Sequence, residues 1–362
     1  MNCLPTILSF LSLLPLISTT ALSPRTSSTN LSILAGYHVI YSYSGTTVPA
    51  ALLNSVKAGK VGGIILFGDN VDSAIATHMA SIQSAYKQSA SYPGYPLLIV
   101  TDQEGGEVKR LPGGPDMSAK EVGEQSNPAS AATDAGTQAA ASCTNAGVNG
   151  NLAPVLDVYR SPGDFEDQYQ RSFGNTSALV STCGTAFIKS QQAKGVVATA
   201  KHFPGLGAAS ADENTDEAPV TLNLTLAEIR SVDEAPYVKA IAAGVKMIMP
   251  SWATYPSLDA DRPSGLSSKW IQSELRGRLG FKGVTISDAI EAGGLEAFGS
   301  DDGARAVLAM QAGMDIILAA AEDESQGSEI VDAIVAALND DTLDRDAFDA
   351  STNRILSLRK GL

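Results

Sequence analysis

Eight short runs of apolar and β-branched residues recur along the chain, and each ends in polar or glycine-rich residues. The runs cover residues 38–43, 62–67, 97–102, 148–158, 196–203, 246–251, 283–288 and 315–319. Between most of them lie stretches with helical spacing, several of them alanine-rich, at residues 71–89, 127–146, 178–193, 226–243 and 267–279. Strands that alternate with helices predict a parallel sheet, and eight strands close a barrel. We therefore expect an α/β fold, a (β/α)8 TIM-like barrel.

A doubly wound open sheet is the rival arrangement. Such a sheet normally carries a glycine-rich GxGxxG turn after an early strand, and none of the predicted strand–helix junctions has that sequence. The chain also lacks a Pro/Ser-rich linker that would separate a second domain. We therefore expect a single domain.

The amino-terminal segment contains an uncharged apolar run at residues 6–19, followed by small residues. A transmembrane helix needs about 20 apolar residues, so this run is too short to span a bilayer comfortably. Pro5 and Pro15 disfavour a buried helix. The pattern predicts a signal peptide over residues 1–22 and a catalytic domain over residues 23–362, secreted and without a membrane anchor once the signal is removed.

The charge balance excludes some classes of partner. Lys and Arg number 25 against 39 Asp and Glu, a formal net charge of −14. An acidic surface repels phosphate backbones and anionic lipids, so we expect neither nucleic-acid nor membrane-surface binding. The three histidines are too scattered for a zinc site, and we expect no metal and no cofactor.

The cysteines and glycosylation motifs fit an extracellular protein but leave alternatives open. After signal removal the chain keeps Cys143 and Cys183, which either close a loop of about 40 residues as a disulfide or remain buried thiols. Asn-x-Ser/Thr sequences stand at Asn30, Asn175 and Asn223.

Polar and aromatic residues gather at the predicted strand ends, where barrel enzymes place their chemistry. These residues are Asp102, Glu104, Asp157, Lys201, His202, Trp252 and Asp288. Carboxylates with donors such as Lys and His suit a polyhydroxylated ligand, and a carboxylate could attack an anomeric carbon. A sugar hydrolase is one possibility among several barrel enzymes. Another is an aldolase that uses Lys201 as a Schiff-base nucleophile.

Six segments carry a closer resemblance. They are VGGIILFGDN (61–70), DQEGGEVKRL (102–111), NLAPVLDV (151–158), RSFG (171–174), KHFPG (201–205) and LGFKGVTISD (279–288). Their order and spacing resemble glycoside hydrolase family 3, specifically its single-barrel branch, which includes the β-N-acetylglucosaminidases. The resemblance extends from about Tyr37 to the last predicted strand, and the pairing of DQEGG with KHFPG is highly specific.

The resemblance implies a retaining exo-β-glycosidase without a cofactor, acting on a small sugar or oligosaccharide. Asp288 matches the catalytic nucleophile of the family. Asp102, Arg110, Arg171, Lys201 and His202 match its sugar-binding positions, and the strand-end residues Asp157 and Trp252 are further substrate-binding candidates. Arg171 could instead form a salt bridge beneath the barrel rim, and Glu104 is expected to be a buried support for its loop.

One departure concerns the general acid/base. The resemblance places a histidine of a mobile loop where this chain has Asn214, and asparagine cannot shuttle a proton near neutral pH. A loop carboxylate (Asp212, Glu213 or Asp216) could act as the acid. Alternatively, the substrate has a good leaving group, or the protein binds sugars without hydrolysing them. We expect the first, with burial raising the pKa of the carboxyl group that acts.

Two further departures bear on the sugar. Glu107 stands where the resemblance suggests a basic residue, and Ala289-Ile290-Glu291 follows the nucleophile in place of the usual residues. N-acetylglucosamine is the expected sugar, with glucose or another β-linked hexose left open. The two tryptophans of the chain argue against a long cleft lined by stacking platforms.

Overall fold

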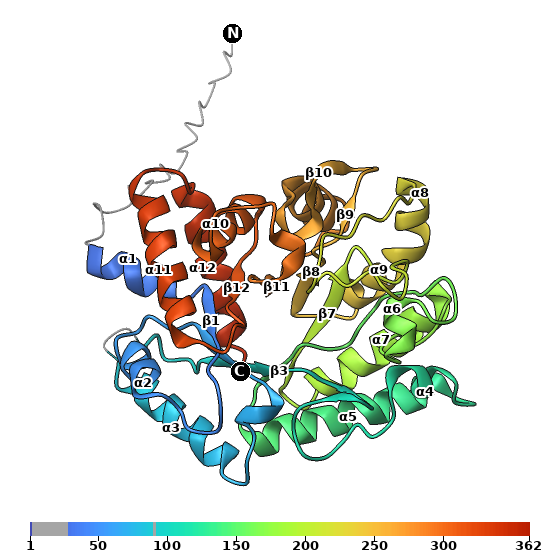
Figure 1. The fold of residues 1–362 in the computed structure, drawn as a ribbon, viewed down its shortest axis with the longest axis horizontal. Coiled ribbons are helices and arrows are strands. Elements are labelled where there is room, and N and C mark those ends of the chain that lie inside the picture. The colour runs from blue at the N-terminus through green and yellow to red at the C-terminus, as the bar shows by residue number, and fades with distance from the viewer. Residues whose placement is uncertain (2–27, 90–91) are drawn as a thin grey trace.

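A computed structural model describes Met1, residues 28–89 and residues 92–362. Apart from Met1, the predicted signal peptide lies outside the described residues and stays a prediction. Eight parallel strands close into a barrel in the order β1–β12–β11–β8–β7–β6–β3–β2 (Figure 1). They are β1 (Val39–Tyr41), β2 (Gly63–Leu66), β3 (Leu98–Thr101), β6 (Gly150–Asn151), β7 (Val197–Phe203), β8 (Met247–Pro250), β11 (Val284–Ala289) and β12 (Ile316–Leu318). Each falls on one of the eight predicted runs, so the predicted barrel is confirmed.

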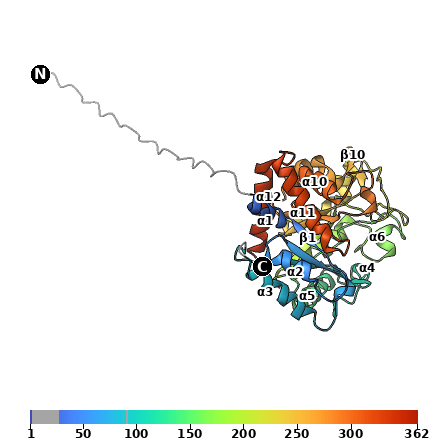
Figure 2. The same ribbon diagram turned by 60° about the vertical axis from the view of Figure 1, so that its left-hand side comes forward.

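Helices surround the strands (Figures 1 and 2). They are α1 (Ser28–Gly36), α2 (Ala50–Lys57), α3 (Ile75–Lys87), α4 (Ala119–Gly123), α5 (Pro128–Ala146), α6 (Phe165–Gln168), α7 (Ser177–Gln192), α8 (Leu226–Glu228), α9 (Ala235–Ala242), α10 (Asp302–Ala312), α11 (Glu324–Asn339) and α12 (Arg345–Arg359). The predicted helix at 226–243 is split by a π-helical turn (Ile229–Asp233), and that at 267–279 is a π-helical segment (Lys269–Arg278). Two hairpins, β4 (Gln103–Gly105) with β5 (Val108–Lys109) and β9 (Thr254–Tyr255) with β10 (Asp259–Pro263), lie outside the barrel.

Branched and long apolar side chains from the barrel strands, and from Leu152 directly after β6, fill the inside of the barrel. The cluster consists of Ile40, Ile65, Leu98, Val100, Leu152, Val197, Met247, Met249, Val284, Ile286, Ile316, Leu318 and Ile355. Ile355 comes from α12, and Leu358 and Leu362 pack against the same cluster. The last helix therefore covers the end of the barrel where the strands begin, and the opposite end remains for a site.

The alanine-rich α5 packs closely against α7, with a glycine at the contact. A Cβ atom at Gly136 of α5 would lie 2.5 Å from the carbonyl oxygen of Phe187 in α7, so a larger residue does not fit there. Cys143 of α5 and Cys183 of α7 are free and buried, which is the second of the two alternatives left open by the sequence. Burial raises the pKa of Cys143 to about 12 and that of Cys183 to about 11, so both thiols are unreactive.

The described residues include no helix that is both long and apolar enough to cross a membrane. Asn175 and Asn223 are exposed, as glycosylation would require.

A buried ion-pair network fastens α12 to the barrel. Asp315, which precedes β12, is fully buried and pairs with Arg276 and Arg354 at 2.7 Å each. It also accepts hydrogen bonds from Ser351 Oγ (2.7 Å) and the Thr285 N–H (2.9 Å). Burial alone would raise the pKa of Asp315, but the two guanidinium groups outweigh it and hold the pKa below its usual value.

We expect Asp315→Ala to lower the free energy of unfolding by about 3 kcal/mol, because it leaves two guanidinium groups without their partner. A carboxyl group with a lowered folded-state pKa stabilises the fold fully above its usual pKa of about 3.9 and loses that contribution as the pH falls through the folded-state value. Urea unfolding should therefore show a difference between wild type and variant at neutral pH that shrinks in acid. Asp349→Ala, which removes the exposed ion pair with Arg345, is the control and should cost less than about 1 kcal/mol. Equal losses in both variants would contradict a special role for Asp315.

Candidate active site

A cavity of about 530 Å³ opens at the carboxyl ends of the barrel strands. Its floor is apolar, since Ile65, Leu152, Met249 and Leu318 belong both to the cavity lining and to the barrel interior. Charged side chains from the loops after the strands form its walls. The size and the mixed lining are typical of a small-molecule site.

The β4–β5 hairpin brings two acidic side chains to this cavity. The Gln103 side chain is buried, and its Oε1 accepts hydrogen bonds from the N–H of Arg110 (3.0 Å) and of the next residue (2.9 Å). Gly105 has a φ of +126°, and a Cβ there would lie 2.4 Å from a backbone oxygen. The hairpin therefore needs Gln103 and Gly105 in order to place Asp102 and Glu104 on the cavity wall.

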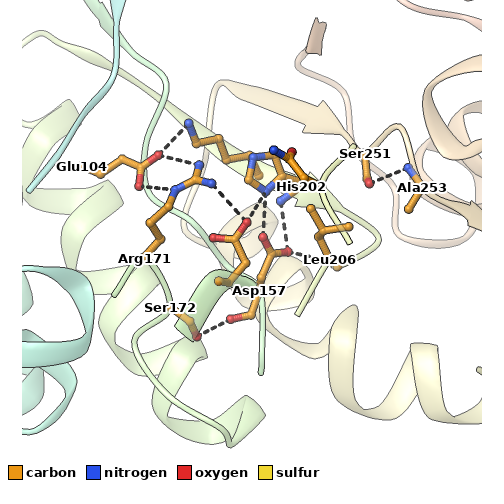
Figure 3. A network of polar contacts seen from close by, with 12 residues as sticks. Glu104, Asp157, Arg171, Ser172, His202, Leu206, Ser251 and Ala253 are labelled. Atoms are coloured by element: carbon orange, nitrogen blue, oxygen red, sulfur yellow. Dashed lines mark hydrogen bonds and ion pairs between the residues drawn. The ribbon is translucent and has the colours of Figure 1, made fainter. Parts of the chain in front are cut away.

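Glu104 joins two cations on the wall (Figure 3). Arg171 donates from Nε and Nη2 to the two oxygens of Glu104 at 3.0 and 2.9 Å. Lys201 Nζ lies 2.8 Å from Glu104 and 2.7 Å from Asp102. Burial alone would raise the pKa of Glu104, but Arg171 and Lys201 outweigh it and lower that pKa to about 2. Glu104 thus lies where a buried support was expected, and Arg171 forms a salt bridge and also lines the cavity.

His202 is oriented by buried carboxyl groups (Figure 3). Its Nδ1 lies 2.7 Å from Asp157 and 3.7 Å from Glu166. Burial lowers the pKa of His202, but these carboxylates outweigh it and the pKa is raised. Because Nδ1 faces Asp157, the Nε2 edge of the ring is the one available to a ligand.

Asp157 lies beneath the cavity wall and does not line it. It is fully buried, and its Oδ1 accepts hydrogen bonds from the N–H groups of His202 (3.2 Å) and Leu206 (2.7 Å). The sequence singled Asp157 out as a substrate contact, whereas the structure gives it the geometry of a positioning residue for the KHFPG turn.

Asp157, Glu166 and His202 are also close enough to ligate a metal, since their ligand atoms lie within 4.8 Å of one another. However, His202 pairs with Asp157, and Glu166 Oε1 lies 3.2 Å from Arg171. Burial raises the pKa of Glu166 more than Arg171 and His202 lower it. These contacts fit a hydrogen-bonded network that fixes His202 and Arg171.

Asp288 is at the end of β11, on the cavity wall. The pairing of β11 with β12 shifts register between Ile286 and Ala289, and such an irregularity turns a side chain away from its regular direction. Asp288 Oδ1 accepts a hydrogen bond from the Ala289 N–H at 2.9 Å. The hydroxyl of Ser287 donates to the Asp288 carbonyl (2.6 Å). The carboxyl group is therefore held by local bonds and is open to a ligand.

The loop after β7, residues 206–218, carries the three carboxyl groups that the sequence offered as acids. Asp212 is exposed and does not line the cavity, and Glu213 accepts hydrogen bonds from the Ser210 N–H (2.7 Å) and hydroxyl (2.9 Å). Asp216 does line the cavity. The side chain of Asn214, at the expected histidine position, accepts a hydrogen bond from the Asp216 N–H at 3.0 Å. Of the three, Asp216 alone is placed to reach a ligand.

The 206–218 loop is docked against the segment that follows β11. The N–H groups of Gly293 and Gly294 donate to the carbonyl oxygens of Asp216 (2.8 Å) and Thr215 (2.9 Å). A Cβ at Gly293 would lie 2.2 Å from the oxygen of Glu217, so the contact depends on glycine. Asp216 is thereby held at the rim of the cavity that Asp288 also lines. Enclosure of its carboxyl group and the charge of Asp288 raise the pKa of Asp216 to about 6, against the opposing effect of His202, Arg171 and Lys201.

The structure places Trp252 away from the cavity. Its ring is buried against Gly265, and Nε1 donates to the carbonyl oxygen of Ala289 at 2.9 Å. Arg110 lines the cavity, and its Nε is buried without a hydrogen-bond partner among the described residues.

The cavity residues that the sequence did not single out include three from one segment. Phe165, Glu166 and Tyr169 lie in or just after α6, on the loop between the LDV and RSFG motifs. That loop follows a barrel strand, which is the one signal that could have drawn attention to it. Glu291, noted as a departure after the nucleophile, also lines the cavity and accepts a hydrogen bond from Gln326 at 2.9 Å.

Comparison with known proteins places the chain in a single family. Residues 42–358 match the glycosyl hydrolase family 3 N-terminal domain. An "uncharacterized secreted glycosyl hydrolase" of Arthroderma benhamiae is 53% identical over 333 residues, which cover 92% of this chain and 94% of that protein. A "beta-hexosaminidase" of Idiomarina loihiensis is 32% identical over 307 residues, covering 83% of this chain and 89% of the relative.

Solved structures agree with this. The β-N-acetylhexosaminidase of Beutenbergia cavernae superimposes with a TM-score of 0.82 at 33% identity, covering 91% of this chain and 98% of that one. A glycoside hydrolase family 3 β-N-acetylglucosaminidase of Paenibacillus sp. FPU-7 gives a TM-score of 0.84 at 31% identity. The match covers 91% of this chain and 62% of the Paenibacillus chain, so the present chain spans less than two thirds of that structure.

Proposed function

The chain belongs to glycoside hydrolase family 3, and on that basis we propose that it is a secreted, retaining exo-β-glycosidase that acts on terminal β-N-acetylglucosaminides. It is a glycoside hydrolase that resembles N-acetylhexosaminidases. The choice of sugar follows the names of its relatives, with β-glucosides as the alternative. Secretion is supported by the apolar segment at residues 6–19 and by the secreted relative from Arthroderma.

The observation that carries the proposal is a pair of carboxyl groups on one cavity wall, Asp288 and Asp216, with the pKa of Asp216 raised to about 6. A carboxyl group that keeps its proton in mildly acidic solution can protonate a leaving group, while a second carboxylate attacks. In this chain Asp216 supplies the proton that the absent histidine cannot supply.

The reaction then has two steps. Asp288 forms a bond to the anomeric carbon as the glycosidic bond breaks, and the proton of Asp216 goes to the departing oxygen. Asp216, now ionised, takes a proton from water, and that water attacks the anomeric carbon and releases Asp288. Asp102, Arg171, Lys201 and His202 offer charged acceptors and donors to the sugar hydroxyls from the same cavity.

The shape of the site supports removal of one terminal sugar. The apolar floor closes the cavity at the barrel interior, so a chain cannot pass through it. A polysaccharide would therefore enter by its non-reducing end.

The test is hydrolysis by the purified protein of an aryl β-N-acetylglucosaminide and of the matching aryl β-glucoside, with proton NMR of the first sugar released. We expect faster turnover of the N-acetylglucosaminide and a β-anomer as first product, because two displacements at one carbon retain its configuration. An α-anomer as first product would contradict the covalent mechanism. Faster turnover of the glucoside would overturn the proposed sugar while keeping the mechanism.

A sugar-binding protein without hydrolysis is the second candidate, and Asn214 at the histidine position is the observation that favours it. Saturable binding of N-acetylglucosamine by a folded protein that turns over neither glycoside would support this candidate over the enzyme.

A further inference from the structure

Tyr169 is an exposed aromatic residue on the rim of the cavity. Its relative exposure is 49%, and among the described residues the other exposed large apolar side chains are Met1 and Val238. Tyr169 is the one of the three that lines the cavity. An exposed aromatic ring beside a binding site is a candidate contact surface, because leaving it in water costs free energy that a ligand can recover.

The ring is held in place by its neighbours. It meets Phe165 edge to face, with ring centroids 5.4 Å apart and planes at 71°, and Phe165 is itself buried. The next residue, Gln170, has a φ of +56°, which is uncommon for a residue other than glycine. Gln170 is fixed by a hydrogen bond from the Lys120 N–H (3.2 Å) and another from the Ser118 hydroxyl (3.0 Å). Tyr169 is thus presented by an ordered turn between the buried Phe165 and the partly buried Arg171.

Depth separates Tyr169 from the charged groups that would hold the terminal sugar. The side chains of Lys201 and Glu104 are 4% and 5% exposed, whereas Tyr169 lies at the mouth. In a pocket that admits one terminal sugar, the deep groups contact that sugar and the rim contacts what is attached to it.

The segment of Tyr169 also touches the 206–218 loop. The Phe165 N–H donates to the Ala209 carbonyl at 3.0 Å, and Gln168 Nε2 donates to the Ala211 carbonyl at 2.8 Å. The same loop carries Asp216, which in the proposed reaction protonates the oxygen that joins the terminal sugar to its leaving group. Tyr169 and Asp216 therefore lie on two segments that contact each other and that both line the cavity.

We propose that Tyr169 forms a leaving-group subsite in which its ring stacks on the apolar face of a neutral pyranose. The preferred substrates are then β-linked disaccharides and short oligosaccharides with a sugar, not a small alkyl group, at the leaving position. The inference rests on the proposed function and adds the class of leaving group.

The experiment compares two substrates with the same terminal sugar. N,N′-diacetylchitobiose has a pyranose as leaving group, and N-acetyl-β-glucosaminyl fluoride has none. We expect Tyr169→Ala to lower kcat/KM for the disaccharide by about tenfold, as the loss of one aromatic stacking contact predicts, and to leave the fluoride unchanged. Tyr169→Phe keeps the ring and should retain the disaccharide rate. Val238→Ala, which removes an exposed apolar side chain on α9 outside the cavity, should change neither rate.

Several outcomes would overturn the subsite. They are equal losses on both substrates, an unchanged disaccharide rate in Tyr169→Ala, or a loss in Tyr169→Phe as large as in Tyr169→Ala. If the wild type hydrolyses the fluoride and any of these three outcomes is found, the subsite is refuted and the proposed function stands. A folded wild type that hydrolyses neither substrate refutes the proposed function and the subsite with it.

Discussion

Replacing Asp288 by asparagine is expected to lower kcat/KM by about 10⁴-fold or more, because the amide cannot form the glycosyl-enzyme bond. The fold should be unaffected, since asparagine keeps the Oδ1 atom that accepts the Ala289 N–H. The measurement is hydrolysis of an aryl β-N-acetylglucosaminide, together with thermal unfolding of both proteins.

Covalent trapping separates a nucleophile from a mere binding group. A 5-fluoro glycosyl fluoride should add the mass of one fluorosugar to the wild type, on the peptide that contains Asp288, and nothing to Asp288→Asn. Asp102→Asn is the matched control, because it removes another cavity carboxylate that pairs with Lys201. Asp102→Asn should lower the rate of hydrolysis and still be labelled by the fluoride. Labelling of Asp288→Asn at the wild-type rate would contradict the role of Asp288.

The barrel could be predicted from the sequence because its strands are buried on both faces and so read as continuous apolar runs. The details that failed have local causes. The run at 148–158 contains only the short β6 (Gly150–Asn151), since Pro154 lacks the N–H that a continued strand needs. The helix at 226–243 is interrupted because Pro236 cannot donate a helical hydrogen bond, and the Glu234 N–H bonds to Ile229 instead. The last helix, α12, comes after α11, which already completes the eighth strand–helix unit, so the strand count gave no reason to expect it.

The sequence predicts which residues reach the cavity where their position at a strand end decides it. Asp102, Lys201, His202 and Asp288 come at strand ends and line one cavity. The same rule failed for Trp252, because a residue that follows a strand can point into the surrounding helices as well as into the cavity. The residues of the α6 segment lie on the loop after β6 but well past the strand end, so only the folded loop brings Tyr169 to the rim. Which of Asp212, Glu213 and Asp216 reaches the cavity likewise could not be predicted, because it depends on how the 206–218 loop docks.

Asp216→Asn should lower kcat/KM by about a thousandfold for a glycoside with a poor leaving group and leave an activated dinitrophenyl glycoside nearly unchanged. The acid assists only departures that need a proton, so the loss should grow as the leaving group worsens. Asp212→Asn is the matched control on the same loop, since its side chain is exposed and outside the cavity lining. A uniform loss on both substrates in Asp216→Asn would point to binding, not to acid catalysis.

The pH dependence of the rate is an independent test of Asp216 as the general acid. The protonated form of Asp216 is the active one, and its pKa is about 6, so wild-type kcat/KM on the poor substrate should fall as the pH rises through about 6. In Asp216→Asn the residual rate should lack that fall, because the titrating group is gone. A fall near the same pH in the variant would assign the proton to another group.

The docking of the 206–218 loop against Gly293 can be disturbed without changing Asp216. Gly293→Ala places a Cβ 2.2 Å from the Glu217 oxygen and must push the 206–218 loop away, although Asp216 itself is intact. If Asp216 is the acid, this substitution should reproduce its signature in weaker form: a selective loss on poor leaving groups and a fall in rate that begins at lower pH, as the displaced carboxyl group becomes more hydrated. Gly68→Ala makes the same change where no atom lies within 4 Å, and it should leave both substrates and the pH profile unaltered. If Gly293→Ala matched Gly68→Ala in every respect, the position of the loop would be irrelevant to the reaction, and the acid would have to come from elsewhere in the cavity.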